Sequence, residues 1–78
     1  EVIFTSKEYK LLVFLMEHPN RVWNKEELFE SVWGFDALDT EVSTVVVHIK
    51  RIRKKLKKAN LSDSPIETLW GSGYRFNR

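Results

Sequence analysis

The sequence predicts a small α+β domain in which a short strand and three helices precede a C-terminal β-hairpin. Three observations support this order: a capping pattern opens the first helix, an apolar stripe marks the third, and two β-prone segments flank a pair of glycines near the end. The chain has 78 residues, no cysteine and 42% hydrophobic residues. These values indicate one globular domain, residues 1–78, that folds on its apolar core without disulfides.

The N-terminal segment Val2–Phe4 is β-prone, and a capping box follows it directly. Thr5 and Glu8 stand three residues apart, so each side chain can satisfy a free backbone amide at the start of a helix. We therefore expect a short strand and then a helix that begins near Ser6.

The first helix should continue to His18, where Pro19 and Asn20 end it. Its run Leu11–Met16 is apolar on almost every side, so a strand is an alternative, but the cap and the continuous length favour a helix buried on several faces. The run is far shorter than the roughly 20 residues of a membrane span. No contact with a membrane is expected.

A second helix is expected after Asn24, whose side chain can cap the next turn while Glu27 lies three residues further on. Gly34 should end this helix. The following segment, residues 35–40, is predicted to be a partly acidic loop that exposes Phe35 and Leu38.

The third helix is expected from about Glu41 to about Lys58, and its side chains divide between two faces. The apolar stripe is Val42, Val45, Ile49, Ile52 and Leu56. The opposite strip is Ser43, Thr44, Val47, Lys50, Arg51, Lys54 and Lys58, with His48 and Arg53 on its flanks. The apolar stripe has the spacing of a core-facing side. The opposite face has small, uncharged side chains near its start and basic side chains toward its end.

The C-terminal part is predicted to be a polar loop, residues 60–65, followed by a hairpin. Its strands should be Ile66–Trp70 and Tyr74–Asn77, joined by Gly71-Ser72-Gly73. Glycines at both ends of the connection allow the positive φ angles of a tight turn.

Charge is distributed unevenly along the chain. Residues 1–41 carry four basic and nine acidic groups, and residues 42–78 carry nine basic and two acidic groups, so the halves have net charges of −5 and +7. This asymmetry predicts that one face meets a polyanion, which charge alone does not identify as nucleic acid, acidic protein or lipid.

The sequence contains no constellation typical of an enzyme. His18 and His48 have no cysteine or paired carboxylates at ligand spacing, and Gly71-Ser72-Gly73 is too short for a phosphate-binding loop and opens no helix. We therefore expect no catalysis, no metal and no cofactor.

The third helix suits entry into the major groove of DNA. Its small polar residues permit a close approach to base edges, and its lysines and arginines reach bases or phosphates. The alternative is that these basic residues do not bind DNA. Exposed basic residues are often only solvated, and cations near a helix C-terminus also complement its dipole.

Four blocks of the sequence resemble the DNA-binding effector domain of the OmpR/PhoB family of bacterial two-component response regulators. The first two are Thr5-x-x-Glu8-x-x-Leu11-Leu12, and Lys25-Glu26-x-Leu28 with Val32-Trp33-Gly34. The others are Thr44-Val45-x-Val47-His48-Ile49-x-Arg51-Ile52-Arg53-x-Lys55-Leu56 and Ile66-x-Thr68-x-x-Gly71-x-Gly73-Tyr74-Arg75-Phe76. Their order and spacing make the resemblance specific over nearly the whole chain.

The resemblance implies a winged helix-turn-helix that binds double-stranded promoter DNA and regulates transcription, with the third helix in the major groove and the hairpin 66–77 as wing. Positions that face bases are matched by Ser43, Thr44, Val47, Arg51 and Arg53. Positions that contact the backbone are matched by Lys25, Trp33, His48, Lys50, Thr68 and Tyr74. The helical pattern alone adds Lys54 to the backbone set, and Trp70 and Arg75 belong to the wing.

Several of these residues have a second interpretation. Trp33 and Tyr74 are equally well explained as core aromatics, Arg53 as an intramolecular salt-bridge partner, and Thr68 as a residue that only fits a strand. Lys54 is more readily explained as solvated.

The sequence also departs from the family pattern. Many members have Arg where Ser43 stands, Asp where Val46 stands, and a wing Arg where Trp70 stands. Each change alters a DNA contact that the pattern would otherwise supply.

The resemblance further implies that residues 34–40 contact RNA polymerase and that two copies bind head-to-tail on direct repeats. A sensor histidine kinase would act only through a phosphorylatable receiver domain, which this chain lacks, so we expect the chain to be part of a longer cytoplasmic bacterial protein. The rival function is a protein-interaction module of the same fold with its basic face on an acidic partner.

Overall fold

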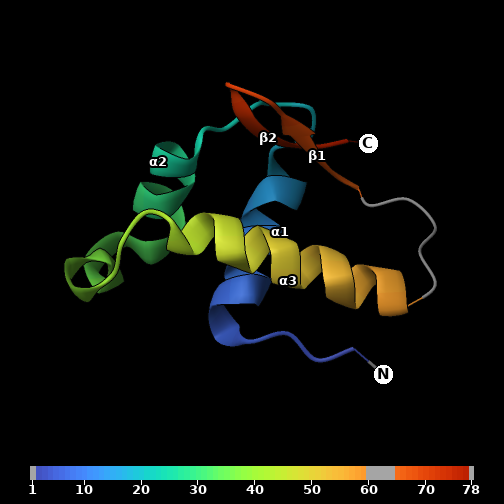
Figure 1. Cartoon of the computed structure of the whole chain (residues 1–78), viewed down its shortest axis with the longest axis horizontal. Coiled ribbons are helices and arrows are strands. Elements are labelled where there is room, and N and C mark those ends of the chain that lie inside the picture. The colour runs from blue at the N-terminus through green and yellow to red at the C-terminus, as the bar shows by residue number, and fades with distance from the viewer. Residues whose placement is uncertain (1, 60–64, 78) are drawn as a thin grey trace.

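The computed structural model describes residues 2–59 and 65–77. Its elements are α1 (Ser6–Glu17), α2 (Lys25–Leu28), η1 (Phe29–Trp33), η2 (Gly34–Asp39), α3 (Thr44–Lys58), β1 (Ile66–Leu69) and β2 (Gly73–Phe76). In Figure 1 α3 crosses the molecule, with the hairpin above it and α1 passing behind it. The predicted order of three helices followed by a hairpin is confirmed. The polar loop predicted for 60–65 lies, except for Pro65, outside the described residues.

The start of α1 follows the capping box that the sequence predicts. The Glu8 amide donates to the Thr5 hydroxyl, and the Thr5 amide donates to the Glu8 carboxylate at 2.9 Å. The helix ends at Glu17, one residue earlier than expected. Asn20, just beyond it, takes a φ of +66°, and its amide donates to the carbonyl of Phe76 at 2.8 Å.

The N-terminal strand expected at Val2–Phe4 is not formed. A strand exists only where a neighbouring strand pairs with its backbone, and no described residue pairs with this segment. Phe4 instead packs against the core with its side chain.

The second helix begins as predicted, because the Glu27 amide donates to the Asn24 side chain at 2.8 Å and the Asn24 amide donates to the Glu27 carboxylate at 2.9 Å. Its α-helical part is only Lys25–Leu28, and the wider π-helix η1 continues it to Trp33. Gly34 then marks the break, with a φ of +52°.

The loop predicted for residues 35–40 is instead the 3₁₀-helix η2, Gly34–Asp39. Two tertiary contacts hold this segment: Ala37 packs against the core, and Asp36 forms an ion pair with Lys7 of α1. The predicted exposure of its apolar residues is confirmed, since Phe35 is 96% exposed and Leu38 is 87% exposed.

The third helix starts at Thr44, three residues later than expected from Glu41. The preceding residues form a tighter turn, in which Thr44 donates to the Glu41 carbonyl and Val45 to the Val42 carbonyl. Ser43 precedes the helix and its side chain makes no capping bond. The apolar stripe is confirmed: Val45, Ile49 and Ile52 are buried, and Val42 and Leu56 at its ends are half-buried.

The hairpin pairs β1 with β2 in antiparallel register, from Ile66 opposite Phe76 to Leu69 opposite Gly73. The connection is therefore Trp70–Ser72, and Gly73 belongs to the strand rather than to the turn. The connection between α1 and α2 joins the hairpin, because Trp23 exchanges two backbone hydrogen bonds of 2.8 Å with Tyr74.

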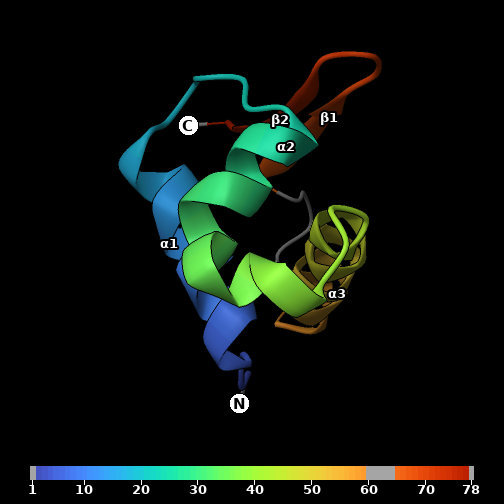
Figure 2. The same cartoon turned by 90° about the vertical axis from the view of Figure 1, so that its left-hand side faces the viewer.

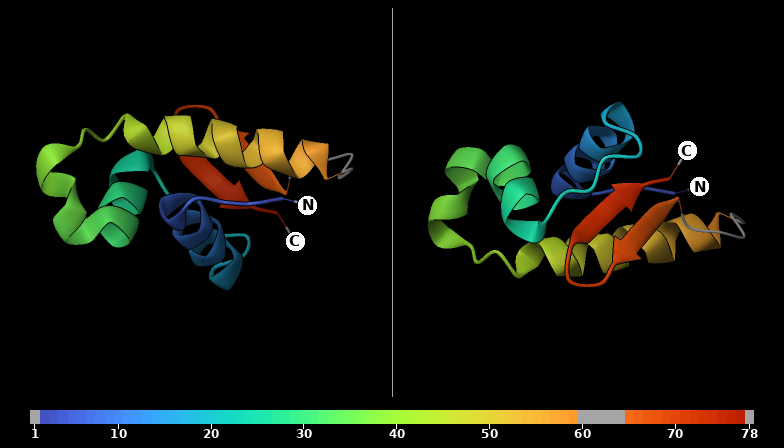
Figure 3. Two further views of the ribbon diagram at one scale, coloured as in Figure 1. Left: turned by 90° about the horizontal axis from the view of Figure 1, so that it is seen from below. Right: turned by 90° about the horizontal axis from the view of Figure 1, so that it is seen from above.

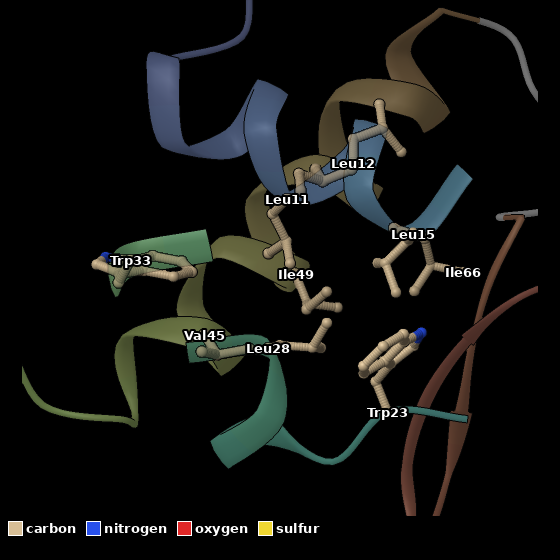
Figure 4. Close-up of a cluster of buried hydrophobic side chains, with 10 residues drawn as sticks. Leu11, Leu12, Leu15, Trp23, Leu28, Trp33, Val45, Ile49 and Ile66 are labelled. Carbon is tan, nitrogen blue, oxygen red and sulfur yellow. The ribbon is translucent and has the colours of Figure 1, made fainter. Parts of the chain in front are cut away.

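The core lies where α1, α3 and the hairpin meet (Figure 4). Its buried hydrophobic residues are Leu11, Leu12, Leu15, Trp23, Leu28, Trp33, Val45, Ile49, Ile52 and Ile66. They come from every helix except η2, from β1 and, with Trp23, from the connection between α1 and α2. Burial of this set holds α3 by its apolar side and leaves its other side outward.

The arrangement brings α3 and the turn of the hairpin to one side of the molecule. Figure 2, which looks roughly along α3, shows the hairpin turn projecting to the same side as α3, while α1 lies on the other side. In Figure 3 the η1–η2 segment forms one end of the molecule, beyond the N-terminal end of α3. The fold thus separates η2 from the hairpin turn.

Candidate nucleic-acid interface

The outward side of α3 forms a continuous polar and basic surface, which we call the front face. It comprises Ser43, Thr44, Val47, Lys50, Arg51 and Lys54. Of these only Thr44 is half-buried, and Val47 is 43% exposed although it is apolar. The front face exists because Val45, Ile49 and Ile52 turn the opposite side of the helix into the core.

Near the start of α3, polar contacts with Thr44 hold the side chain of His48. The ring nitrogen Nδ1 of His48 donates to the carbonyl oxygen of Thr44 at 2.8 Å and lies 3.2 Å from the Thr44 hydroxyl. The His48 ring also meets the indole of Trp33 edge-on, with centroids 4.9 Å apart. Since Trp33 is only 5% exposed, it packs in the core and supports the His48 ring from the core side.

Arg53 lies on the side of α3 that faces the hairpin. Its guanidinium donates through Nε and Nη2 to the carbonyl of Ile66, at 3.2 and 2.8 Å, and through Nη2 to the hydroxyl of Thr68 at 2.6 Å. The charged group also lies 5.8 Å from the ring centre of Tyr74. The structure thus brings Arg53, which was predicted to face bases, together with Thr68 and Tyr74, which were predicted to contact the DNA backbone.

The wing carries one exposed aromatic and one paired arginine. Trp70, in the turn, is 92% exposed. Arg75 faces Glu67 on the opposite strand and donates to its carboxylate through Nε at 3.2 Å and Nη2 at 2.6 Å. Of the two wing residues predicted to lie near DNA, only Trp70 has a fully open side chain.

A groove of about 430 Å³ separates the hairpin from the starts of α2 and α3. Its lining residues include Lys25, Val46, Thr68, Trp70 and Tyr74. Lys25 is exposed at the first position of α2. The groove therefore joins the predicted contact residues of three elements on one side of the molecule.

The sequence did not reveal an ion pair between a buried carboxylate of α1 and a half-buried lysine of α3. Glu8 is 1% exposed and accepts a hydrogen bond from the ammonium of Lys55 on α3. Burial raises the pKa of Glu8, but the bonds from Lys55 and from the Thr5 amide outweigh it and hold the pKa below its usual value of 4.5. The capping box pointed to Glu8, whereas no local signal identified a partner 47 residues away.

Other kinds of site are not found where the structure is described. Within residues 2–59 and 65–77, no group of three His, Cys, Asp or Glu side chains could hold a metal ion. None of the helices in these ranges is long and apolar enough to cross a membrane.

Comparison with known proteins places this geometry in a family. Residues 1–76 match the family described as transcriptional regulatory protein, C terminal. The response regulator SaeR of Staphylococcus aureus strain USA300 is 46% identical over 78 residues, which are all of this chain and 34% of that protein. The chain therefore spans about a third of the length of this relative.

Solved structures agree in fold. The response regulator DrrB, an OmpR/PhoB homologue of Thermotoga maritima, is 32% identical with a TM-score of 0.80, and the match covers 99% of this chain and 34% of that one. The DNA-binding domain of the response regulator AdeR, solved in complex with an intercistronic region, is 27% identical with a TM-score of 0.83, over 99% of this chain and 74% of that one.

The family settles the class of function. Its members use this domain to bind DNA in transcription regulation, and the expectation that the chain is not an enzyme is confirmed. Both the sequence match and the three-helix fold with its hairpin support the same assignment. The chain belongs to the C-terminal domains of transcriptional regulatory proteins and is a winged helix-turn-helix output domain of the OmpR/PhoB type.

Proposed function

We propose that α3 lies in the major groove of duplex promoter DNA and that the hairpin contacts the adjacent minor groove and backbone. The observation that carries this proposal is the front face of α3, whose residues are exposed except for the half-buried Thr44. The helix itself lies on the side of the molecule to which the hairpin turn projects (Figure 2). A helix of 15 residues is about 22 Å long, so its first half can enter a groove about 12 Å wide while its second half reaches the flanking phosphates.

The front face divides into two roles. Ser43, Thr44, Val47 and Arg51 meet base edges, because the first three are small enough for close approach and Arg51 offers a fork of donors. The charged ends of Lys50 and Lys54 meet phosphates. Further backbone contacts are assigned to Lys25, His48, Thr68 and Tyr74, around the groove and the start of α3.

Trp33 and Arg75 have a supporting part in this proposal. Trp33 packs in the core against His48, and Arg75 pairs with Glu67. Trp33 therefore supports the contact residue His48, and Arg75 is held across the hairpin by Glu67, so neither side chain is assigned a DNA contact of its own.

Contacts with other proteins would use a different surface. The apolar side chains of Phe35 and Leu38 on η2 are almost fully exposed at the end of the molecule away from the hairpin turn. This position supports a contact between residues 34–40 and RNA polymerase while DNA is bound. The family resemblance supports two further proposals. Two copies of the domain bind head-to-tail on direct repeats, and a sensor kinase acts on the whole cytoplasmic protein through its receiver domain.

Selection of bound duplexes from a random pool, followed by titration of the winning duplex at several salt concentrations, tests the DNA proposal. We expect a site preference of at least 10³ over scrambled duplex and a linear fall of log affinity with log salt. An acidic polypeptide of equal charge serves as the competitor. Equal binding to the polypeptide and to all duplexes would favour the rival function, an acidic protein partner.

A double substitution, Phe35→Ser with Leu38→Ser, separates the two surfaces. Because both side chains are exposed, the fold and the duplex affinity should stay unchanged while polymerase recruitment in a transcription assay is lost. Unchanged recruitment would remove η2 from the polymerase contact.

A further inference from the structure

Arg51 and Arg53 stand two positions apart on α3, and a helix turns about 200° over two residues. Their side chains therefore leave the helix in nearly opposite directions. Arg51 is exposed on the front face, whereas Arg53 is half-buried toward the hairpin. The two arginines cannot both point into the same groove of DNA.

The side of α3 that carries Arg53 is the side that faces the hairpin. Val46 lies seven residues before Arg53, on nearly the same helical face, and lines the groove between α3 and the wing. Ile49, between them, is buried in the core. Arg53 thus belongs to the row of residues that sets how the hairpin lies beside α3.

Arg53 joins α3 to β1 through a set of hydrogen bonds that we call the Arg53 clamp. Two guanidinium nitrogens share the Ile66 carbonyl, and one of them also reaches the Thr68 hydroxyl, so the first and third residues of β1 are held by one rigid, planar group. Charged hydrogen bonds with such a fork are stronger and more directional than neutral ones. The Tyr74 ring, on β2 opposite Thr68, lies near the same charge.

We propose that Arg53 is a positioning residue that fixes the wing relative to α3, so that both elements meet their two grooves together. This inference rests on the proposed placement of α3 and the hairpin on DNA. In a duplex the major groove and the adjacent minor groove have a set separation, and a protein that occupies both gains affinity only if its two elements are held at the matching distance and angle. Arg53 supplies that restraint and reads no base.

The test uses two duplexes with the same selected core site. One extends past the core through the flank beneath the wing, and the other ends before that flank. The full chain with Arg53→Gln is compared with the wild type on both, and Arg51→Gln is the matched control on the same helix. Base preference within the core is measured for each variant on the short duplex.

We expect Arg53→Gln to lose about tenfold in affinity on the long duplex, about the value of one charged hydrogen bond, and less than twofold on the short one. Its base preferences within the core should stay those of the wild type. Arg51→Gln should lose affinity on both duplexes and relax the preference at one base pair. Equal losses for Arg53→Gln on both duplexes, or a relaxed core preference, would overturn the proposal.

Arg53→Lys keeps the charge but offers a point donor instead of a fork, and it decides the question if the Gln variant fails to fold. Its loss should again be confined to the long duplex. The double variant Arg53→Lys with Thr68→Val should lose less affinity than the sum of the two single losses. Both substitutions remove the same hydrogen bond, between Arg53 and Thr68. Strict additivity would count against the clamp. A wild-type chain without site preference on either duplex would instead refute the proposed function, and this inference with it.

Discussion

Single residues of α3 differ in how firmly the protein holds them. His48 is tied to Thr44 and Trp33, and Arg53 to the hairpin, whereas Lys50 and Arg51 extend into solvent. An exposed side chain is free to adapt to a ligand, and a held one is arranged before the ligand arrives. Substitutions on α3 should therefore have different signatures according to position.

The exposed Arg51 tests base recognition. If it forms a paired contact with a base edge, Arg51→Ala should cost about 1–3 kcal/mol of binding free energy on the preferred site and relax the preference at one base position. Affinities for the selected site and its single-base variants measure both effects. A uniform loss on every sequence would reassign Arg51 to the DNA backbone.

Lys50 tests phosphate contact. Lys50→Ala should weaken binding to matched and mismatched duplexes alike and reduce the log–log salt slope by roughly one unit, since one fewer counterion is released. Titrations at several salt concentrations measure the slope. Lys10→Ala, which removes an exposed charge from α1, is the control and should leave the slope unchanged. If Lys50→Ala behaves like this control, Lys50 does not contact phosphate.

At the scale of elements, the hairpin gains rigidity from the connection between α1 and α2. Trp23 pairs with Tyr74, and Asn20 donates to Phe76, so the short two-stranded sheet has a third segment along one edge. An isolated hairpin is marginal in water, and this pairing helps to explain how four-residue strands hold a wing in place.

Gly73 makes this close approach possible. A Cβ at this position would lie 2.0 Å from the carbonyl oxygen of Trp23, and the residue has a φ of +139°. Gly73→Ala should therefore lower the free energy of unfolding by more than about 2 kcal/mol, which combines backbone strain with a steric clash. Gly71→Ala is the matched control, because φ there is +84° but the space is open, and it should cost about 1–2 kcal/mol. Urea unfolding of both variants measures the difference, and equal losses would mean that the Trp23 contact is unimportant.

We expect the wing turn to determine how strongly the domain prefers particular sequences in the DNA that flanks its site. Trp70 is uncharged and 92% exposed, whereas an arginine would be drawn into the narrow, more negative minor groove of A·T-rich DNA. Trp70→Arg should then strengthen binding to A·T-rich flanks more than to G·C-rich flanks and steepen the salt dependence. Affinities for one core with varied flanks, at two salt concentrations, test this. A strong A·T preference in the wild type that the substitution leaves unchanged would refute it.

At the scale of the whole molecule, two ion pairs join α1 to distant parts of the chain. The buried Glu8 binds the half-buried Lys55 of α3, and Lys7 binds the exposed Asp36 of η2. The exposed pair contributes little, because water screens it. The Glu8 pair matters more, because the buried carboxylate would be costly to keep charged without its partner.

The Glu8 pair predicts how stability depends on pH. Because the folded state lowers the pKa of Glu8, its ionised form contributes stability fully above the unfolded value near 4.5, and this contribution is lost as the pH falls through the folded pKa. Glu8→Gln should lower the free energy of unfolding by about 2 kcal/mol at neutral pH. The difference between variant and wild type should shrink well below pH 4.5. Urea unfolding over this pH range measures it, with the exposed Glu17→Gln as control. A difference that stays constant with pH would exclude Glu8 ionisation as the cause.

The sequence by itself determined the features that depend on near neighbours. Both capping boxes, at Thr5 and Asn24, follow from residues three positions apart, and the buried side of α3 follows from its helical period. The front face could be predicted for the same reason, since whatever lies opposite the apolar stripe must face outward. The family resemblance, read from four spaced blocks, predicted the class of function.

Only the tertiary structure decided features that depend on segments far apart in the chain. Val2–Phe4 forms no strand because no described strand lies beside it, and residues 34–39 become a 3₁₀-helix held by Lys7 and the core. Arg53 turns to the hairpin because its acceptors, on Ile66 and Thr68, lie there. These residues are 13 and 15 positions further along the chain. Such contacts form only when packing brings distant groups together, so no local pattern encodes them.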